Sequence, residues 1–173
     1  MEVLQLINEG SKKLRDKKII SHKLDSEILL SKVLNKTREQ LLINLEQNMC
    51  SKEINFFQKL IARRSLNEPI AHILKQKEFW SKNFFVNHHA LIPRPETELM
   101  VEKIISIFNK KDIFILDIGT GTGCLLLSIL GELKNSKGIG IDISQNSIKI
   151  AKINGKKHKL NLRAKFYKRS LNE

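Results

Sequence analysis

Cysteine, proline and long apolar runs are scarce in this chain of 173 residues. The 2 cysteines lie far apart in apolar surroundings, without the spacing of a metal site. Cys50 and Cys124 are therefore predicted to be buried free thiols rather than a disulfide or a catalytic group. No apolar run is long enough to span a bilayer, and no charged-then-apolar leader follows Met1. We expect a cytoplasmic protein with no membrane partner.

Positive charge dominates the composition. The 31 lysine and arginine residues exceed the 18 acidic residues, which gives a formal net charge of +13. A basic surface favours anionic partners such as RNA or ribosome-associated complexes. The chain is also rich in Asn, Ile and Lys, and a lysine-rich proteome would explain the same excess. Proximity to RNA or the ribosome is therefore one of two open interpretations.

The first 66 residues lack proline and contain a single glycine, Gly10. Ser51 has the position of a helix N-cap, with Glu53 in the first turn. Apolar side chains recur at helical spacing in residues 4–14, 25–34, 38–45 and 51–64. This pattern predicts a small helical bundle over residues 1–66.

The pattern changes at Pro69, which disfavours a helical conformation at the residue before it. Residues 70–74 and 78–86 then predict two short strands, which would form a β-hairpin linker within residues 67–90. The hairpin carries four aromatic residues: Phe79, Trp80, Phe84 and Phe85. We expect them to pack on the helical bundle, although stacking on a nucleobase is the alternative.

Residues 91–173 predict an alternation of helices and strands. Pro93 and Pro95 hold the backbone extended before a helix from Glu98 to about Phe108. A buried strand over 113–118 is followed by a helix over 124–133, a strand over 138–143, and a helix over 145–157 capped by Ser144. Residues 165–167 could begin a third strand. A strand–helix–strand unit implies a parallel sheet, so the chain as a whole is predicted to be α+β.

The first of these strands leads into a glycine loop formed by Gly119, Thr120, Gly121, Thr122 and Gly123. Glycines at this turn let the backbone approach a ligand closely, and the loop amides favour an anion or polar group. Asp117 ends the first strand and could orient the loop, while Asp142 ends the second, where a carboxylate can accept from ribose hydroxyls. The G-x-G-x-G spacing departs from the dinucleotide pattern, and no Gly-Lys-Ser/Thr follows as in a P-loop. A nucleotide-like cofactor is predicted.

The sequence D-I-G-T-G-T-G-C at 117–124 resembles motif I of the class I S-adenosylmethionine-dependent methyltransferases. Residues 68–73, 78–80 and above all 91–98 (L-I-P-R-P-E-T-E) resemble the release-factor glutamine methyltransferases, the PrmC/HemK family. The resemblance implies an N-terminal helical domain for substrate recognition (1–66), a β-hairpin linker (67–90) and the N-terminal part of a Rossmann-like α/β methyltransferase domain (91–173). It also implies S-adenosyl-L-methionine as cofactor. The implied reaction is N5-methylation of the glutamine in the GGQ motif of class 1 peptide chain release factors.

The resemblance assigns the cofactor to Gly119, Thr120, Gly121, Thr122, Gly123 and Asp142, with Arg94, Thr97 and Glu98 beside it. Local roles compete for two of these: Thr97 as a helix cap and Arg94 in an ion pair. Where the family has an acid near the adenine, this chain has Ser170 and Leu171.

The family's N-P-P-Y motif, which presents the glutamine amide, is absent from the sequence. We therefore assign no catalytic residue and expect this chain to be an inactive, incomplete part of the enzyme, in which a sheet of two or three strands leaves apolar faces exposed. His88 and His89 are interpreted as a loop pair, so no metal site is assigned. The alternatives are a non-catalytic remnant or binding module for a translation factor, and part of a fusion with a tRNA methyltransferase. A monomer is expected.

Overall fold

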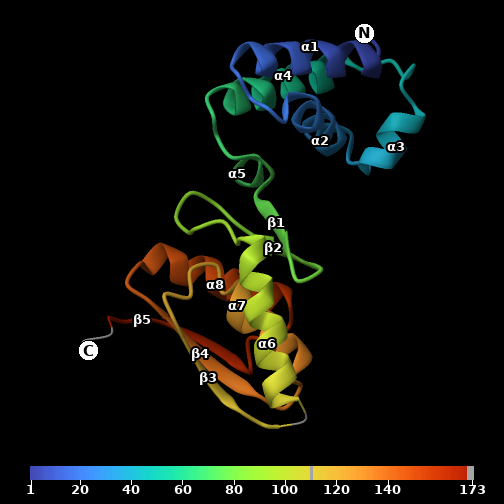
Figure 1. Cartoon of the computed structure of the whole chain (residues 1–173). Helices are drawn as coiled ribbons and strands as arrows, with labels where there is room; N and C mark the ends of the chain where they lie inside the picture. Colours follow the sequence, from blue (N-terminus) through green and yellow to red (C-terminus); the bar gives the residue numbers. More distant parts are fainter. Residues whose placement is uncertain (110, 171–173) are drawn as a thin grey trace. The chain divides into compact units, whose positions relative to one another are not determined.

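The computed structural model describes residues 1–109 and 111–170, which form two compact units (Figure 1). Residues 1–74 make up the first unit and residues 75–173 the second. No helix within the described residues has both the length and the apolar character needed to cross a membrane. The predicted change from an all-helical part to an α/β part is confirmed.

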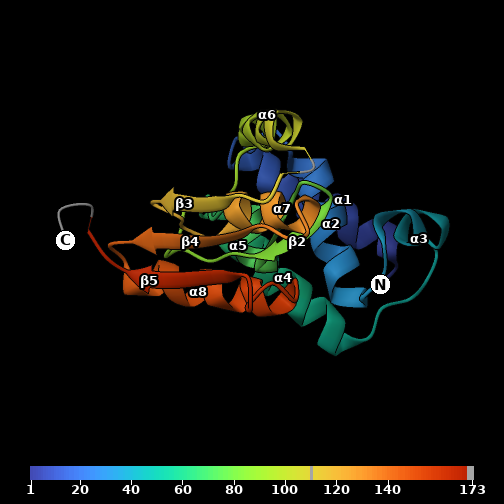
Figure 2. The same ribbon diagram turned by 90° about the horizontal axis from the view of Figure 1, so that it is seen from below.

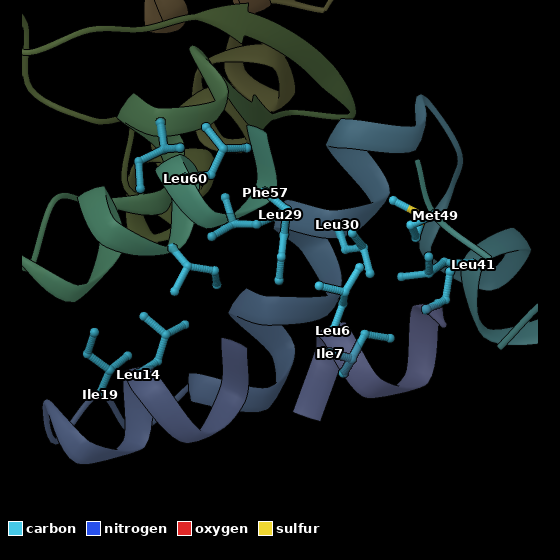
Figure 3. Close-up of a cluster of buried hydrophobic side chains, with 13 residues drawn as sticks. Leu6, Ile7, Leu14, Ile19, Leu29, Leu30, Leu41, Met49, Phe57 and Leu60 are labelled. Carbon is cyan, nitrogen blue, oxygen red and sulfur yellow. The ribbon is translucent and has the colours of Figure 1, made fainter. Parts of the chain in front are cut away.

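The first unit is a bundle of helices. Its elements are α1 (Val3–Asp16), α2 (His22–Leu34), α3 (Arg38–Ile43), α4 (Ser51–Ser65) and α5 (Ile70–Leu74). Their inward-facing residues form one core, drawn in Figure 3: Leu6, Ile7, Leu14, Ile19, Leu29, Leu30, Leu41, Met49, Phe57 and Leu60. The buried residues of α1 and α4 follow the 3.6-residue helical period, whereas α2 is buried on more than one side and also encloses Asp25 and Glu27.

A buried ion pair ties α4 to α2. The Arg64 Nε lies 2.7 Å from Oδ2 of Asp25, and their side chains are 16% and 5% exposed. The Ser21 hydroxyl donates to the same Asp25 oxygen at 2.8 Å. These partners satisfy a carboxylate that would be costly to bury alone.

The start of α4 differs from the prediction by one residue. Cys50, rather than Ser51, is the N-cap, and its main-chain N–H donates to Oε2 of Glu53 at 2.8 Å. Cys50 is exposed, so its predicted burial is wrong, because the cap position faces solvent. Cys124 is half-buried, and burial raises the pKa of its thiol. Both thiols are free, as predicted.

The strand predicted over residues 70–74 is wrong, because this segment is helix α5. The Pro69 carbonyl accepts from the main-chain N–H groups of His72 and Ile73 at 2.9 and 3.2 Å. Proline suits the start of a helix, since its fixed φ is helical and its missing N–H is not needed there. Pro69 therefore begins a new helix, a few residues after α4 has ended at Ser65.

The second unit begins with a hairpin of β1 (Gln76–Phe79) and β2 (Lys82–Phe85). The turn η1 (Pro95–Thr97) and helix α6 (Glu98–Phe108) follow, and then β3 (Phe114–Ile118), α7 (Cys124–Glu132), β4 (Lys137–Asp142), α8 (Gln145–Lys157) and β5 (Ala164–Lys168). The last three strands are parallel and lie in the order β3-β4-β5 (Figure 2). The Ser144 side chain accepts from the N–H of Ser147 and caps α8, as predicted.

The hairpin aromatics belong to the core of the second unit. Phe79 and Phe84 are fully buried in one cluster with residues of α7 and with Phe166 of β5. Trp80 packs against the same cluster, so the expected packing on the helical bundle is wrong for Phe79, Phe84 and Trp80. The hairpin places one side chain from each strand toward α7 and α8, an arrangement that depends on contacts far apart in the sequence.

Strand β3 is buried on one face only. Phe114, Leu116 and Ile118 alternate along it and are 67%, 56% and 50% exposed. Ile115, between them, packs against the core. The predicted burial of this strand holds for one face only, because α7 packs on the face that carries Ile115 and Gly138. The exposed apolar residues on the other face agree with the apolar faces expected of a sheet of two or three strands.

Candidate cofactor-binding site

Three glycines with positive φ shape the loop between β3 and α7. The φ angles of Gly119, Gly121 and Gly123 are 75°, 54° and 77°. L side chains rarely adopt this region, so the loop conformation depends on glycine. A Cβ at Gly119 would meet no atom within 4 Å, whereas one at Gly123 would lie 3.2 Å from Ala151 Cβ. Gly123 therefore serves packing, and Gly119 leaves open space beside the loop.

The chain itself uses most of the loop amides. The N–H groups of Gly119 and Thr120 both donate to the Ile141 carbonyl at 2.9 Å. The Gly121 N–H donates to Oδ2 of Asp142 at 3.0 Å. The amides at positions 119–121 thus donate to polar groups of the chain itself and hold the loop against β4, and the part that the loop takes in ligand binding stays a prediction. Such a loop differs from a phosphate cradle, in which the amides point at the ligand.

Two carboxylates stand at the carboxyl edge of adjacent strands. Asp117 is in β3 and accepts from the Thr120 hydroxyl at 2.7 Å, while Asp142 ends β4. Besides the Gly121 amide, Asp142 accepts from the N–H of Ser144 at 2.8 Å through Oδ1. Burial raises the pKa of the Asp117 carboxyl; the Thr120 hydroxyl opposes this rise and the charge of Asp142 adds to it. No lysine or arginine among the described residues forms an ion pair with either carboxylate.

Such an arrangement suits a polar, cationic ligand. A carboxylate offers about four acceptor sites, and hydrogen bonds from the chain occupy two of those on Asp142. The remaining sites can accept ligand hydroxyls. Two neighbouring negative charges without a basic partner would instead repel a phosphate.

A close approach between the loop and β4 explains one further glycine. A Cβ at Gly140 would lie 2.6 Å from the Thr120 hydroxyl oxygen and 2.7 Å from the Phe166 ring. Thr120 and Thr122 are buried, with exposures of 6% and 2%. These buried threonines hold the loop in place, while Gly119 leaves open space beside it.

Asn154, which the sequence interpretation missed, connects the loop to the hairpin. This fully buried side chain of α8 donates to the Thr122 carbonyl at 2.9 Å and to the Phe85 carbonyl at 3.0 Å. Its Oδ1 accepts from the Phe85 N–H at 2.7 Å. The signal in the sequence was a single amide on the inward face of α8, one turn after Ile150 and Ala151. Such a residue indicates a buried polar contact, but the pattern does not reveal its partners.

Residues 94–98, before and at the start of α6, also have surroundings of their own in the fold. Glu98 accepts the Trp80 N–H at 2.9 Å through Oε1, so its carboxylate anchors the hairpin turn. Thr97 holds the N-cap position of α6, but its side chain makes no capping hydrogen bond. Arg94 is exposed and has no ion pair with a described residue. No hydrogen bond among the described residues joins these three side chains to the glycine loop, so their part in cofactor binding stays a prediction.

Ser170, His88 and His89 can also be located. Ser170 follows β5, and Leu171 lies outside the described residues. His88 and His89 lie in the loop after β2 with ring centroids 3.9 Å apart. No group of three potential metal ligands occurs within the described part of the chain.

Comparison with known families agrees with this division of the chain. Residues 5–74 match the family model of the PrmC N-terminal domain. Residues 109–173, which include the glycine loop and both carboxylates, match a methyltransferase domain.

Individual relatives extend the match across both units. The release factor glutamine methyltransferase of Buchnera aphidicola (subspecies Schizaphis graminum) is 46% identical over 139 residues, covering 80% of this chain and 50% of that protein. That of Leptospira interrogans is 40% identical over 151 residues, covering 86% and 53%. A bifunctional methyltransferase of Rickettsia typhi is 39% identical over 175 residues, covering 90% and 34%. The chain spans about half the length of the first two proteins. The chain is thus similar to the N-terminal portion of release factor glutamine methyltransferases.

Proposed function

We propose that this chain binds S-adenosyl-L-methionine at the glycine loop and Asp142 and forms the cofactor-binding part of a protein-glutamine methyltransferase. The observation that carries the proposal is the pair of carboxylates, Asp117 and Asp142, beside a loop whose amides at 119–121 are already bonded within the chain. A dinucleotide would bring a pyrophosphate to this place, where it would meet negative charge and few available donors. S-adenosyl-L-methionine brings no phosphate and carries a cationic sulfonium.

The residues present fit this cofactor. Asp142 has acceptor sites left for the ribose hydroxyls, and Gly119 leaves space for the ligand to approach the backbone. When bound, the cofactor supplies a methyl group on a sulfonium, which is activated toward a nucleophile. The chain's own part is to hold the loop still: Asp117 orients Thr120, while Asp142 orients Gly121. A site already fixed by such bonds loses little freedom on binding.

Calorimetric titration of the chain with S-adenosyl-L-methionine, S-adenosylhomocysteine and NAD⁺ tests the cofactor. Binding of the first two, without NAD⁺, is expected. The Asp142→Ala variant should bind at least about tenfold more weakly, since it loses charged hydrogen bonds to the ribose. Asp112→Ala is the matched control, because it removes the same charge from an exposed position outside the site. NAD⁺ binding as tight as that of S-adenosyl-L-methionine would refute the choice of cofactor.

For the substrate, we propose the glutamine of the GGQ motif in class 1 peptide chain release factors. Support comes from the relatives named release factor glutamine methyltransferase and from the match of residues 5–74 to the PrmC N-terminal domain. In this proposal residues 1–66 recognise the release factor, residues 91–173 hold the cofactor, and residues 67–90 link these two parts of the chain. None of the described residues is assigned to present the amide, so we expect the chain alone to bind a release factor without methylating it.

Incubation of this protein with tritiated cofactor and a class 1 release factor measures methyl transfer to the release factor. A release factor whose GGQ motif is changed to GGA shows whether the label enters the glutamine of that motif. Label incorporated equally into both would contradict the glutamine assignment. Binding of the release factor without transfer by any form of the gene product would favour a binding module instead. The similarity to a bifunctional methyltransferase supports a second candidate, a part of a fusion with a tRNA methyltransferase, for which label would also enter tRNA.

A further inference from the structure

A groove of about 340 Å³ lies between α8 and β5, one of the two edge strands of the parallel sheet that the described residues form. The two elements run side by side in Figures 1 and 2. Three lysines line it, Lys152 and Lys156 from the helix and Lys165 from the strand, together with Tyr167 and Asn161. None of the lining residues belongs to the glycine loop, β3 or β4, so this groove is separate from the candidate cofactor site.

The charge around the groove is of one sign. Between Ile143 and Ser170 the sequence contains nine lysine or arginine residues and no acidic residue. At the chain's average of 18 acids in 173 residues, a stretch of 28 residues would contain about three. The lining lysines are exposed, and none forms an ion pair with a described carboxylate. A lysine-rich composition alone explains many lysines but not the absence of acids.

Arg163, one of these nine basic residues, stabilises the fold. Its guanidinium donates to the carbonyls of Leu130, Leu133 and Ser136 at 2.6 to 3.0 Å and closes the end of α7. Lysine on an edge strand also protects against strand pairing, which would account for Lys165. It does not account for the helix lysines on the opposite wall. The Lys165 ammonium donates to the Asn161 carbonyl at 3.1 Å, so its positive charge stays at the strand side of the groove, and no described carboxylate neutralises the lysines on either side.

An aromatic side chain, that of Tyr167, lies beside the lysines in the groove. Tyr167 lines the groove and is 50% exposed, so part of its ring is free to contact a ligand. Lysines that follow a backbone, combined with an exposed aromatic ring, are the combination that single-stranded nucleic-acid sites use. A helix face with lysines alone would suit any polyanion, whereas the half-exposed ring favours a ligand with bases.

We propose that the groove between α8 and β5 binds single-stranded RNA, with Lys152, Lys156 and Lys165 on its phosphates and Tyr167 against a base. This function is independent of the cofactor and of the glutamine substrate. It gives the chain a second anionic partner on a face distinct from the glycine loop.

Fluorescence anisotropy of a labelled oligouridine of about 12 nucleotides, titrated with the whole chain over a range of salt concentrations, tests the proposal. The variant with Lys152, Lys156 and Lys165 all replaced by Ala should bind more weakly, and its slope of log affinity against log salt should fall in magnitude by about 2. Tyr167→Leu should weaken binding about tenfold without changing the slope. Circular dichroism confirms that each variant is folded.

The matched control replaces Lys12, Lys13 and Lys17 by Ala, exposed lysines at the end of α1 in the other unit. Both triple variants carry a net charge of 13 − 3 = +10. Retained affinity in the control and loss in the groove variant support the site. Equal losses in both, no RNA binding by the wild type, or polyglutamate competing as well as RNA would each overturn it.

Discussion

Replacement of Asn154 by Ala should destabilise the second unit and loosen the glycine loop together. The amide makes three hydrogen bonds of 2.7 to 3.0 Å, two to Phe85 and one to the Thr122 carbonyl. A buried polar group left without a partner costs about 1–3 kcal/mol. We take about 2 kcal/mol for the buried Thr122 carbonyl and about 1 kcal/mol for the two half-buried Phe85 groups. The free energy of unfolding should then fall by about 3 kcal/mol.

Urea denaturation followed by tryptophan fluorescence measures this loss. Trp80 is the single tryptophan and lies in the second unit, so its signal reports unfolding of that unit alone. Amide hydrogen exchange should show faster exchange at Phe85 and in the loop after Thr122, and little change in the helical bundle.

Asn146→Ala is the matched control for this prediction. Asn146 is on the same helix, but it is exposed and makes one hydrogen bond of 3.4 Å, to the His89 ring. A surface substitution of this kind should change stability by less than about 0.5 kcal/mol. If Asn154→Ala lost less than about 1 kcal/mol, the three bonds would be weaker than their geometry indicates, and Asn154 would not couple hairpin and loop.

Three other substitutions test separate parts of the second unit. Asp117→Asn should raise the free energy of unfolding at pH 7, because burial raises the pKa of this carboxyl and so disfavours its ionised form in the folded state. The gain should vanish as the pH falls below the ordinary pKa of 3.8. Urea titrations that show no gain at pH 7 would contradict this prediction. His158 should give the opposite pH dependence. Burial lowers the pKa of its imidazole, and the charges of Lys157 and Lys82 lower it further, so stability should be lost as the pH falls below the ordinary histidine pKa of 6.5. His158→Leu should flatten that dependence between about pH 7 and 5, and an unchanged slope in thermal melts would exclude this histidine as the cause. Gly123→Ala should cost about 1–3 kcal/mol, because it combines a φ of 77° with a contact of 3.2 Å to Ala151, and a melting temperature equal to the wild type would show that the loop can relax.

The sequence was informative about the site wherever the signal was local. The glycine spacing predicted a loop with positive φ angles, and all three glycines adopt them. Asp117 and Asp142 were predicted to end neighbouring parallel strands; Asp142 ends β4, and Asp117 is the residue before the end of β3, so both lie near the same edge of the sheet. The sequence did not reveal what the loop amides bind, because the Ile141 carbonyl that accepts from Gly119 lies in the next strand. It also did not reveal the role of Asn154, whose partners lie 69 and 32 residues away.

In the fold, too, local signals could be predicted from the sequence, and contacts between distant segments could not. By itself, the sequence determined the order of elements from α6 to β5, because hydrophobic period, the Ser144 cap and the glycine turn act within a few residues. Tertiary structure decided what local pattern leaves ambiguous. Residues 70–74 are too short for their period to distinguish a helix from a strand, and the hairpin aromatics pack on α7 and α8 rather than on the bundle. Apolar alternation in β3 likewise could not show which of its faces the helices cover, since that depends on where distant segments pack.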